Sequence, residues 1–270
     1  MTSKKTILIT GSTDGIGYEA AKTLIEQGHR VLLHGRNPEK LAAKIEALQP
    51  LSPEGKLRGY ICDLSSMAEV EALAKSVAAD HKSLDVLLNN AGILKTSKPV
   101  TAQGHDVRFL VNTFAPYLLA KRLLPIIPKS GRIINLSSAA QNPIDFDALA
   151  GREQLSEMDA YAQSKLGITI WSRALADKIG NDGPLVVSVN PASLIGTKMV
   201  KEGFGMEGKD IRIGADILVE SAIGESFEGH TGKYFDNDAG AFGRPHPDAE
   251  DPVMIEKVMA AIEEILPEVA

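Results

Sequence analysis

The fold is decided by the stretch Thr10-Gly11-Ser12-Thr13-Asp14-Gly15-Ile16-Gly17, which follows a short apolar run and precedes a helical pattern. We expect a strand at residues 6–10 and a helix at about 15–27. Glycine has no Cβ, so a glycine-rich turn lets the backbone approach an anion closely while the helix N-terminus points at that anion. A glycine cluster alone is often only a flexible turn. Between a first strand and a first helix, however, it predicts a site for the phosphates of a dinucleotide.

Short apolar runs alternate with helical periodicity along most of the chain. We expect a helix at 39–48 and further strands at 30–34, 59–62, 84–89, 132–137 and 185–190. This alternation predicts parallel strands joined by right-handed crossovers. The expected fold class is therefore α/β, a Rossmann-type doubly wound sheet of about seven strands flanked by helices. No repeat or Gly/Ser linker interrupts residues 1–270, which we interpret as one domain.

The composition argues against several classes of protein. The chain has 270 residues, 44% of them apolar, and a net charge of −6. No apolar run approaches the roughly 20 residues of a spanning helix, and the negative charge gives no attraction to phosphate backbones. We therefore expect neither a membrane nor a nucleic acid as partner. The apolar run at residues 7–9 is too short for a signal-peptide core, and the single cysteine, Cys62, cannot form an internal disulfide. Both features fit a cytoplasmic protein.

Two stretches interrupt the alternation. Residues 139–158 carry Asn142-Pro143 and several acidic residues, which indicates an insertion between a strand and the next helix. Residues 191–212 contain four glycines and two methionines. They follow the strand that ends at residue 190, at the sheet edge where such folds bind ligands. We interpret this second segment as a mobile substrate lid, with an ordinary surface loop as the alternative.

The glycine spacing, T-G-x-x-x-G-x-G, resembles that of the classical short-chain dehydrogenases and reductases. The similarity covers nearly the whole chain and continues through further motifs in the order of that family: Asp63-Leu64, Asn89-Asn90-Ala91-Gly92, Asn112, Asn135-Leu136-Ser137-Ser138, Tyr161-Ala162-Gln163-Ser164-Lys165 and Asn190-Pro191. Each motif alone is weak, but together they are specific. Ser138 and Tyr161 lie 23 positions apart, more than is usual in the family, and the excess falls in the insertion. The insertion and residues 231–235 resemble the branch of retinol dehydrogenases and carbonyl reductases.

This resemblance implies an oxidoreductase that moves a hydride between a nicotinamide nucleotide and a carbonyl or alcohol substrate. Asp63 would meet the adenine ring and Lys165 the nicotinamide ribose. The cofactor contacts that the resemblance implies are Gly11, Ser12, Thr13, Gly15, Ile16, Gly17, Asp63, Leu64, Asn90, Ala91, Gly92, Tyr161, Lys165, Pro191, Leu194 and Thr197. The chain also departs from the family after Pro191. It has Ala192 where glycine normally follows the proline, and Thr197 comes one position late.

The end of the second strand favours NADP over NAD. An NAD enzyme of this fold usually has an acidic residue there to bind the ribose 2′-hydroxyl. This chain reads Leu33-His34-Gly35-Arg36-Asn37, without a carboxylate. Arg36 can grip a 2′-phosphate with its planar, permanently charged guanidinium. The alternatives are that Arg36 merely faces solvent and that the enzyme prefers NAD.

Tyr161 and Lys165 are four residues apart in a helical stretch, on one helix face. Reducing a carbonyl requires a general acid, and a free tyrosine has a pKa of about 10. A neighbouring ammonium lowers such a pKa by roughly one to three units, so we predict that Lys165 acidifies Tyr161. Taken alone, this pair is more often a tyrosine with a lysine lying over its ring. Its place in the family pattern makes it a predicted catalytic pair.

The resemblance completes a catalytic group of four. Ser138, rather than Ser137, would donate a hydrogen bond to the substrate oxygen. Asn112 would hold a water in a proton relay from Lys165, a role compatible with fixing a helix kink. The insertion is expected to loop over the substrate pocket. The apolar lid residues favour a small to medium, largely apolar aldehyde, ketone or alcohol.

Other readings of the sequence receive less support. A regulator that binds NADPH without turnover has no need of the tyrosine, and a nucleotide-sugar epimerase would have a different glycine spacing and a large C-terminal domain. The six histidines show no spacing typical of zinc ligands, so we expect no metal. Residues 254–266 predict an amphipathic helix that packs on the core or on a second subunit. Family members are often dimers or tetramers, and a homodimer or homotetramer is compatible with the sequence.

Overall fold

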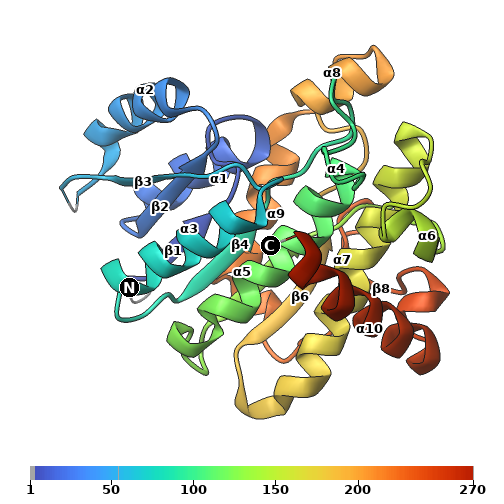
Figure 1. Ribbon diagram of the computed structural model, residues 1–270. Coiled ribbons are helices and arrows are strands. Elements are labelled where there is room, and N and C mark those ends of the chain that lie inside the picture. Colours follow the sequence, from blue (N-terminus) through green and yellow to red (C-terminus); the bar gives the residue numbers. More distant parts are fainter. Residues whose placement is uncertain (1–3, 54, 270) are drawn as a thin grey trace.

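The computed structural model, which describes residues 4–53 and 55–269, is built around one twisted sheet (Figure 1). The strand order is β3-β2-β1-β4-β5-β6-β7-β8. Its strands are β1 (Thr6–Ile9), β2 (Arg30–Gly35), β3 (Arg58–Ile61), β4 (Val86–Asn89), β5 (Arg132–Leu136), β6 (Leu185–Asn190), β7 (Tyr234–Asp236) and β8 (Ala241–Gly243). The first seven strands are parallel, and β8 pairs antiparallel with β7. The predicted doubly wound α/β fold is confirmed, with eight strands instead of about seven because the chain turns back after β7.

Helices cover both faces of the sheet (Figure 1). They are α1 (Gly15–Glu26), α2 (Pro38–Leu48), α3 (Met67–Asp80), α4 (Val107–Phe109), α5 (Ala115–Leu123), α6 (Phe146–Leu149), α7 (Glu157–Ile179), α8 (Lys198–Phe204), α9 (Ile211–Ile223) and α10 (Pro252–Val269). A π-helical turn spans Leu110–Phe114, and short 3-10 turns lie at Gln49–Leu51, Leu124–Ile126, Gly180–Asp182, Glu225–Phe227 and Pro247–Ala249.

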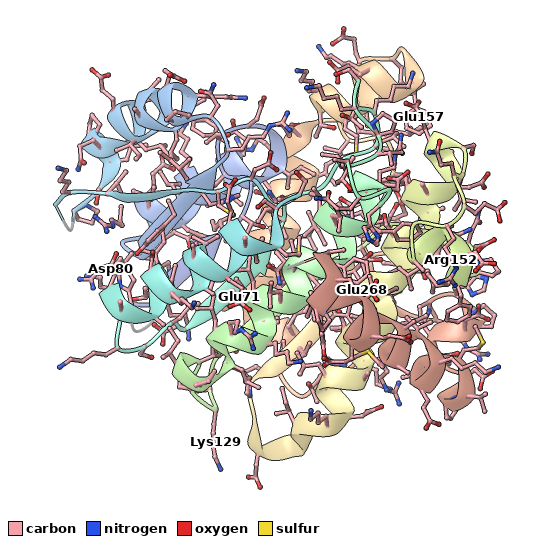
Figure 2. All side chains as sticks on the ribbon, in the orientation of Figure 1. Glu71, Asp80, Lys129, Arg152, Glu157 and Glu268 are labelled. Atoms are coloured by element: carbon pink, nitrogen blue, oxygen red, sulfur yellow. The ribbon has the colours of Figure 1, made fainter. Side chains whose placement is uncertain are left out.

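Alternating side chains of the strands divide the core into two layers. In β1, Leu8 belongs to the layer that contains side chains of α3, α5, α7 and α10, whereas Ile7 and Ile9 belong to the layer that contains side chains of α1, α2 and α9. Strands buried on both faces form near-continuous apolar runs, as a parallel sheet requires. Most charged residues lie on the surface, where Lys129 and Arg152 point away from the fold (Figure 2), whereas Arg108, Arg132 and Lys165 are buried. The layers therefore leave the carboxyl edge of the strands as the place for polar function.

The insertion at 139–158 packs differently from the prediction. Only its ends, at Ala139, Ala140 and Met158, line a cavity that Ser138 and Tyr161 also line. Its middle forms α6, and Ile144, Ala148 and Leu149 are buried in the layer that contains α5 and α7. The middle therefore joins the core and does not loop over the pocket, because its apolar side chains gain more by packing there.

The helix predicted at 254–266 is present as α10, which packs against α7. Its buried side chains are Val258, Ile262, Ile265 and Leu266. Glu263 on the same helix pairs with Lys121 of α5 at 2.6 Å. The apolar face of α10 is thus covered within the chain. Among the described residues, no helix combines the length and the apolar character needed to cross a membrane.

Candidate active site

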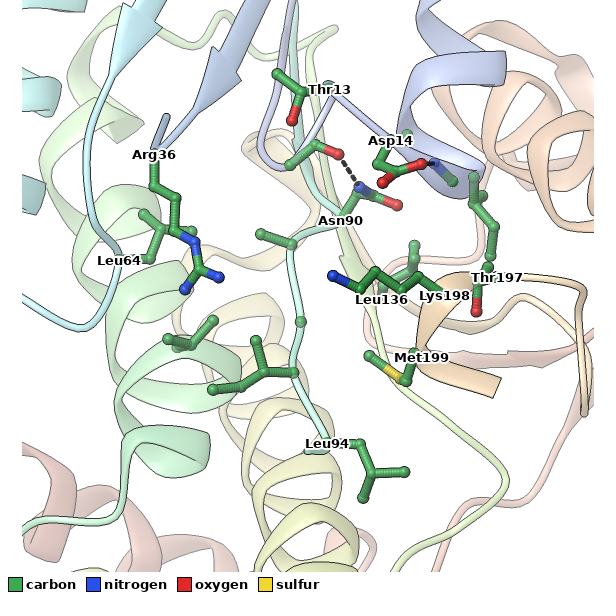
Figure 3. Close-up of a pocket in the computed structure, with 18 of the residues that line it drawn as sticks. Thr13, Asp14, Arg36, Leu64, Asn90, Leu94, Leu136, Thr197, Lys198 and Met199 are labelled. Atoms are coloured by element: carbon green, nitrogen blue, oxygen red, sulfur yellow. Dashed lines mark hydrogen bonds between the residues drawn. The ribbon is translucent and has the colours of Figure 1, made fainter. Parts of the chain in front are cut away.

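A cleft of about 410 Å³ opens at the carboxyl edge of the sheet, where the strand order reverses between β1 and β4 (Figure 3). Ligands of open α/β sheets bind at such switch points. The predicted cofactor residues that line this cleft are Gly11, Thr13, Gly15, Ile16, Gly17, Arg36, Asp63, Leu64, Asn90, Ala91, Gly92, Tyr161, Lys165, Pro191 and Thr197. The tertiary structure therefore brings nearly all of them together from six segments of the chain.

The glycine turn has its shape because its glycines have no Cβ atoms. Gly11 and Gly15 have φ values of 66° and 58°, in the region that favours glycine. A Cβ on Gly17 would lie 2.6 Å from the carbonyl oxygen of Gly11 and would overlap the side-chain amide of Asn90. That amide donates to the carbonyl oxygen of Thr10 at 2.8 Å and to that of Gly11 at 3.2 Å, the second of these bonds being drawn in Figure 3. The turn and the end of β4 thus hold each other in place.

The side chain of Ser12 is turned away from the cleft. It is fully buried, and its Oγ accepts from the backbone N–H of His34 at 2.8 Å. This position is a correction to the predicted cofactor contact, because the hydroxyl is used to join the turn to β2. Leu194 also lies outside the nucleotide cleft and lines a neighbouring cavity.

His34 supports the turn in a way that the sequence analysis missed. Its Nδ1 accepts from the N–H of Gly11 at 3.0 Å, and its Nε2 lies 3.2 Å from the carbonyl oxygen of Cys62. Since a carbonyl only accepts, Nε2 carries the hydrogen. Burial lowers the pKa of His34 to about 4, with the bond to Cys62 opposing it. The ring is therefore neutral at physiological pH and ties the ends of β1, β2 and β3 together. The sequence signal that could have identified His34 was its position at the end of the second strand, two residues before Arg36.

The cleft suits an anionic dinucleotide. Arg36 and Lys198 reach into it from opposite sides (Figure 3), and Lys40 and Lys95 also line it. Asp14 caps α1 by accepting from the N–H of Gly15 and pairs with Lys40 at 2.7 Å. The free N-terminal N–H groups of a helix favour an anion. A backbone cradle without Cβ atoms, a helix N-terminus and several cations together fit the phosphates of a nicotinamide dinucleotide.

A second cavity of about 190 Å³ adjoins the first. Its walls are mainly apolar and include Ile16, Leu94, Met158, Met199, Val200 and Phe204. Tyr161 and Ser137 line both spaces, and Ser138 lines only the second. A phenol therefore stands between a cleft for a dinucleotide and a small apolar chamber.

The two serines differ in what they contact. The Oγ of Ser137 lies 3.1 Å from the carbonyl oxygen of Lys165 and 2.6 Å from the Oγ1 of Thr169, so α7 engages it. Ser138 instead shares a hydrogen bond with the phenol of Tyr161. The carbonyl of Ser138 accepts from the hydroxyl of Tyr234 at 3.1 Å, which fixes its backbone. This geometry favours Ser138 over Ser137 as the group beside the substrate oxygen.

The expected acidification of Tyr161 by Lys165 is wrong for this state of the protein. Burial raises the pKa of Tyr161, with the hydrogen bond from Ser138 opposing it. Lys165 donates to the carbonyl oxygen of Leu136 at 2.7 Å, and its Nζ lies 5.7 Å from the centroid of the tyrosine ring. Burial lowers the pKa of Lys165 to about 7. A lysine that is only partly charged, and that points at a backbone carbonyl, does not outweigh the desolvation of the phenol.

Asn112 lies behind the cleft, within the π-helical turn. Its Oδ1 accepts from the N–H of Ile93 at 2.9 Å, and its Nδ2 donates to the carbonyl of Ile93 and the Oγ of Ser164. A Cβ on Gly92 would lie 3.3 Å from both the Oδ1 of Asn112 and the Nζ of Lys165. The side chain thus fixes the segment after β4 in front of Lys165, and its role in a proton relay stays a prediction.

The segment at 191–212 forms α8, and the residues on either side of this helix are joined by hydrogen bonds into what we call the base of the segment. Gly196 donates to the carbonyl of Lys209 at 2.8 Å, and Lys209 donates back to that of Leu194 at 2.7 Å. Ala192, which stands where the family has glycine, has a φ of 106°. Leu194 has a φ of 57°. Positive φ values at two residues that are not glycine show that the backbone of this base is strained.

Asp238, in the turn between β7 and β8, anchors that base. It accepts from the N–H and hydroxyl of Ser193, the amide of Asn190 and the Nζ of Lys209. Burial would raise the pKa of Asp238, but these hydrogen bonds outweigh it and lower the pKa to about 2. The sequence analysis missed this residue because it is distant in the chain and belongs to no motif. The residues that line the cleft and were also missed are Asp14, Gly35, Lys40, Cys62, Ile93, Leu94, Lys95, Val111, Leu136, Lys198, Met199 and Glu202.

A doubly wound sheet with a glycine turn, and with a serine, a tyrosine and a lysine beside the cleft, defines a nucleotide-dependent oxidoreductase. The chain belongs to the short chain dehydrogenase family, whose model matches residues 5–207. It resembles the retinol-dehydrogenase branch of that family. Among the described residues, no cluster of His, Cys, Asp or Glu has the arrangement of a metal site.

Relatives with known names agree with this assignment. The chain is 31% identical to retinol dehydrogenase 13 of Mus musculus, over 92% of this chain and 79% of that protein. It is also 31% identical to the short-chain dehydrogenase TIC 32 B, chloroplastic, of Brassica napus, over 85% and 79%. A short chain dehydrogenase from Shigella flexneri, solved with NADP, is 28% identical and has a TM-score of 0.69, with 88% of this chain and 98% of that chain covered.

Proposed function

We propose that this protein is an NADP-dependent oxidoreductase that interconverts a carbonyl compound and the corresponding alcohol. The observation that carries the proposal is the position of Tyr161, whose side chain lines both the dinucleotide cleft and the apolar cavity. A proton donor at that boundary is what carbonyl reduction requires. The apolar walls of the cavity favour a small to medium, largely apolar substrate.

The residues of the chain divide the chemistry among them. A bound nicotinamide nucleotide supplies the hydride. Tyr161 donates a proton to the substrate oxygen in reduction, and its raised pKa keeps that proton in place beforehand. Ser138, hydrogen-bonded to the phenol, donates to the same oxygen and stabilises its developing charge. Lys165, in its charged form, stabilises the phenolate that remains.

NADP is proposed over NAD because of Arg36. It lies at the end of β2 and lines the cleft, and that strand ends without a carboxylate (Figure 3). A guanidinium binds a phosphate with two parallel hydrogen bonds, and a carboxylate there would repel it. The solved relatives from Shigella flexneri and Escherichia coli that contain NADP or NADPH support the same choice.

The test is a screen of NADPH consumption across aldehydes, ketones, quinones and retinoids, repeated with NADH. Tyr161→Phe should lower turnover by about 10²- to 10⁴-fold, the usual contribution of a general acid, while the Kd for NADPH stays nearly unchanged. Nucleotide binding without turnover by the wild-type protein on any substrate would contradict the proposed activity.

Arg36→Asp tests the nucleotide preference. It should weaken NADPH binding much more than NADH binding, because only NADPH carries the 2′-phosphate. Lys129→Asp, which makes the same charge change at an exposed site remote from the cleft, is the control. Equal losses for both nucleotides would contradict the proposed contact.

A further inference from the structure

Helix α8 carries an ion pair over the nucleotide cleft. The Nζ of Lys198 lies 3.5 Å from the Oε1 of Glu202, one helical turn later. Both residues line the cleft, and the amine of Lys198 points into it (Figure 3). Their side chains are 73% and 51% exposed, so water weakens the attraction between them. The pair is therefore easily broken by a stronger anion.

The pair lies beside the N-terminus of α1. Thr197 caps α8, and its Cγ2 lies 3.6 Å from the place where a Cβ on Gly15 would stand. Gly15 is the first residue of α1, whose N-terminal N–H groups favour an anion. The residue that follows Thr197 is thus next to the position where the turn would hold the pyrophosphate of a dinucleotide.

We propose that Lys198 exchanges Glu202 for the pyrophosphate when a nicotinamide dinucleotide binds, and so holds α8 against the cofactor. This proposal rests on the proposed function. A charge-assisted hydrogen bond to phosphate is stronger than an exposed lysine–glutamate pair. The carboxylate of Glu202 repels the incoming phosphates, so it gives way when they arrive. Bound cofactor thereby positions Met199 and Val200, which wall the substrate cavity.

The other cations of the cleft are carried by other segments. Arg36 follows β2, and Lys40 on α2 is paired with Asp14 at 2.7 Å. Lys95 lies in the segment after β4. Of the described cations that line the cleft, Lys198 is the one on the lid segment. It alone can couple the position of the lid to the charge of the nucleotide.

The segment at 191–212 supplies matched controls. Lys201 and Glu207 form a second exposed pair, at 2.6 Å, and neither lines the cleft. We would measure the Kd values of NADPH and NADH by titration calorimetry for Lys198→Gln, Lys201→Gln, Glu202→Gln and Glu207→Gln. The titrations would be made at low and at moderate salt, since salt screens charges.

Lys198→Gln should weaken both nucleotides about tenfold at low salt, as expected for one charge-assisted hydrogen bond. Both nucleotides respond because both contain the pyrophosphate. The Kd of this variant should also depend less on salt than that of the wild type. Glu202→Gln should tighten the binding of both nucleotides. Lys201→Gln and Glu207→Gln should bind them with the Kd values of the wild type. Hydrogen exchange of residues 196–208 should slow on adding NADPH to the wild type and not to Lys198→Gln.

Three results would overturn the proposal. An unchanged Kd for Lys198→Gln excludes the contact with the pyrophosphate. An equal loss of nucleotide affinity in Lys201→Gln would mean that the effect of Lys198→Gln is a general effect of charge. A loss for NADPH alone assigns Lys198 to the 2′-phosphate instead of the pyrophosphate. Wild-type protein that binds neither nucleotide contradicts the proposed function as well, whereas normal wild-type binding with any of the three results contradicts only the exchange.

Discussion

The two sides of the active site are built in different ways. On the cofactor side, the glycine turn is bonded to the ends of its neighbouring strands through Asn90 and His34, all close to the buried sheet. On the substrate side, the lid segment projects from the sheet and exposes Phe204 and Met206. Its base is strained at Ala192 and Leu194, and the carboxylate of Asp238 and two backbone hydrogen bonds hold it.

This difference makes one side of the site rigid and the other side adaptable. A cofactor cradle made of backbone and buried hydrogen bonds is rigid, because few changes are tolerated without a clash. A lid held by exposed polar contacts can change its sequence and shape at little cost in stability. Four substitutions or conditions test how far the contrast holds, and they are ordered here by the free energy expected.

Lys165 gives the largest expected effect, since it is buried on the rigid side. The folded protein holds its pKa at about 7, below the ordinary value of 10.5. The unfolded chain therefore binds more protons between these values, and stability rises with pH there. The stability that the folded protein gains when Lys165 is neutral in both states is fully present above pH 10.5, and it is lost as the pH falls to about 7. Urea unfolding from pH 7 to 10 should show a gain on the order of a few kcal/mol that Lys165→Met lacks.

Lys178→Met, at an exposed position on the same helix, is the control and should leave the pH dependence unchanged. Identical pH dependence in wild type and Lys165→Met would show that the lysine is not desolvated in the folded protein.

Gly17→Ala tests the rigid turn directly. The added Cβ meets the carbonyl of Gly11 and the amide of Asn90. We expect a loss of about 1–3 kcal/mol in the free energy of unfolding, typical of overpacking, together with weaker NADPH binding. Gly243→Ala is the control, because nothing lies within 4 Å of its Cβ position. Wild-type stability in Gly17→Ala would mean that the turn is as adaptable as the lid.

Asp238→Asn removes the charge that anchors the lid. We expect a loss of about 1 kcal/mol in stability and a rise in the substrate KM, with a smaller change in the Kd for NADPH. Because the pKa of Asp238 is about 2, the anchor should persist unchanged from pH 4 to 9. Asp216→Asn, at an exposed position on α9, is the comparison. A larger effect on NADPH than on substrate would remove the distinction between the two sides.

Ala192→Gly should have the smallest effect, and it should stabilise. Glycine adopts a φ of 106° without strain, and the relief exceeds the added entropy of the unfolded chain by up to about 1 kcal/mol. Ala139→Gly, where φ is not positive, should instead destabilise slightly. Thermal unfolding of both variants measures the difference. A destabilised Ala192→Gly would indicate that the methyl group packs usefully in the lid base.

The sequence by itself determined the fold class, the glycine turn and the Tyr161–Lys165 pair. The fold class and the turn are encoded locally, since strand and helix periods and glycines without Cβ atoms need only neighbouring residues. The Tyr161–Lys165 pair was predicted to be catalytic only through its place among the family motifs along the chain. The residues that the motifs missed are held by distant partners. His34 acts through Gly11 and Cys62, and Asp238 acts through the lid base.

Only the tertiary structure decided the directions in which the pKa values of Tyr161 and Lys165 are shifted and the path of the insertion. The pKa values of Tyr161 and Lys165 depend on how deeply packing removes them from water, which no spacing along the chain reports. The apolar side chains in the middle of the insertion are buried in the core, so α8 and the two ends of the insertion line the pocket instead. Burial is a property of the assembled layers, and so is each feature that depends on it.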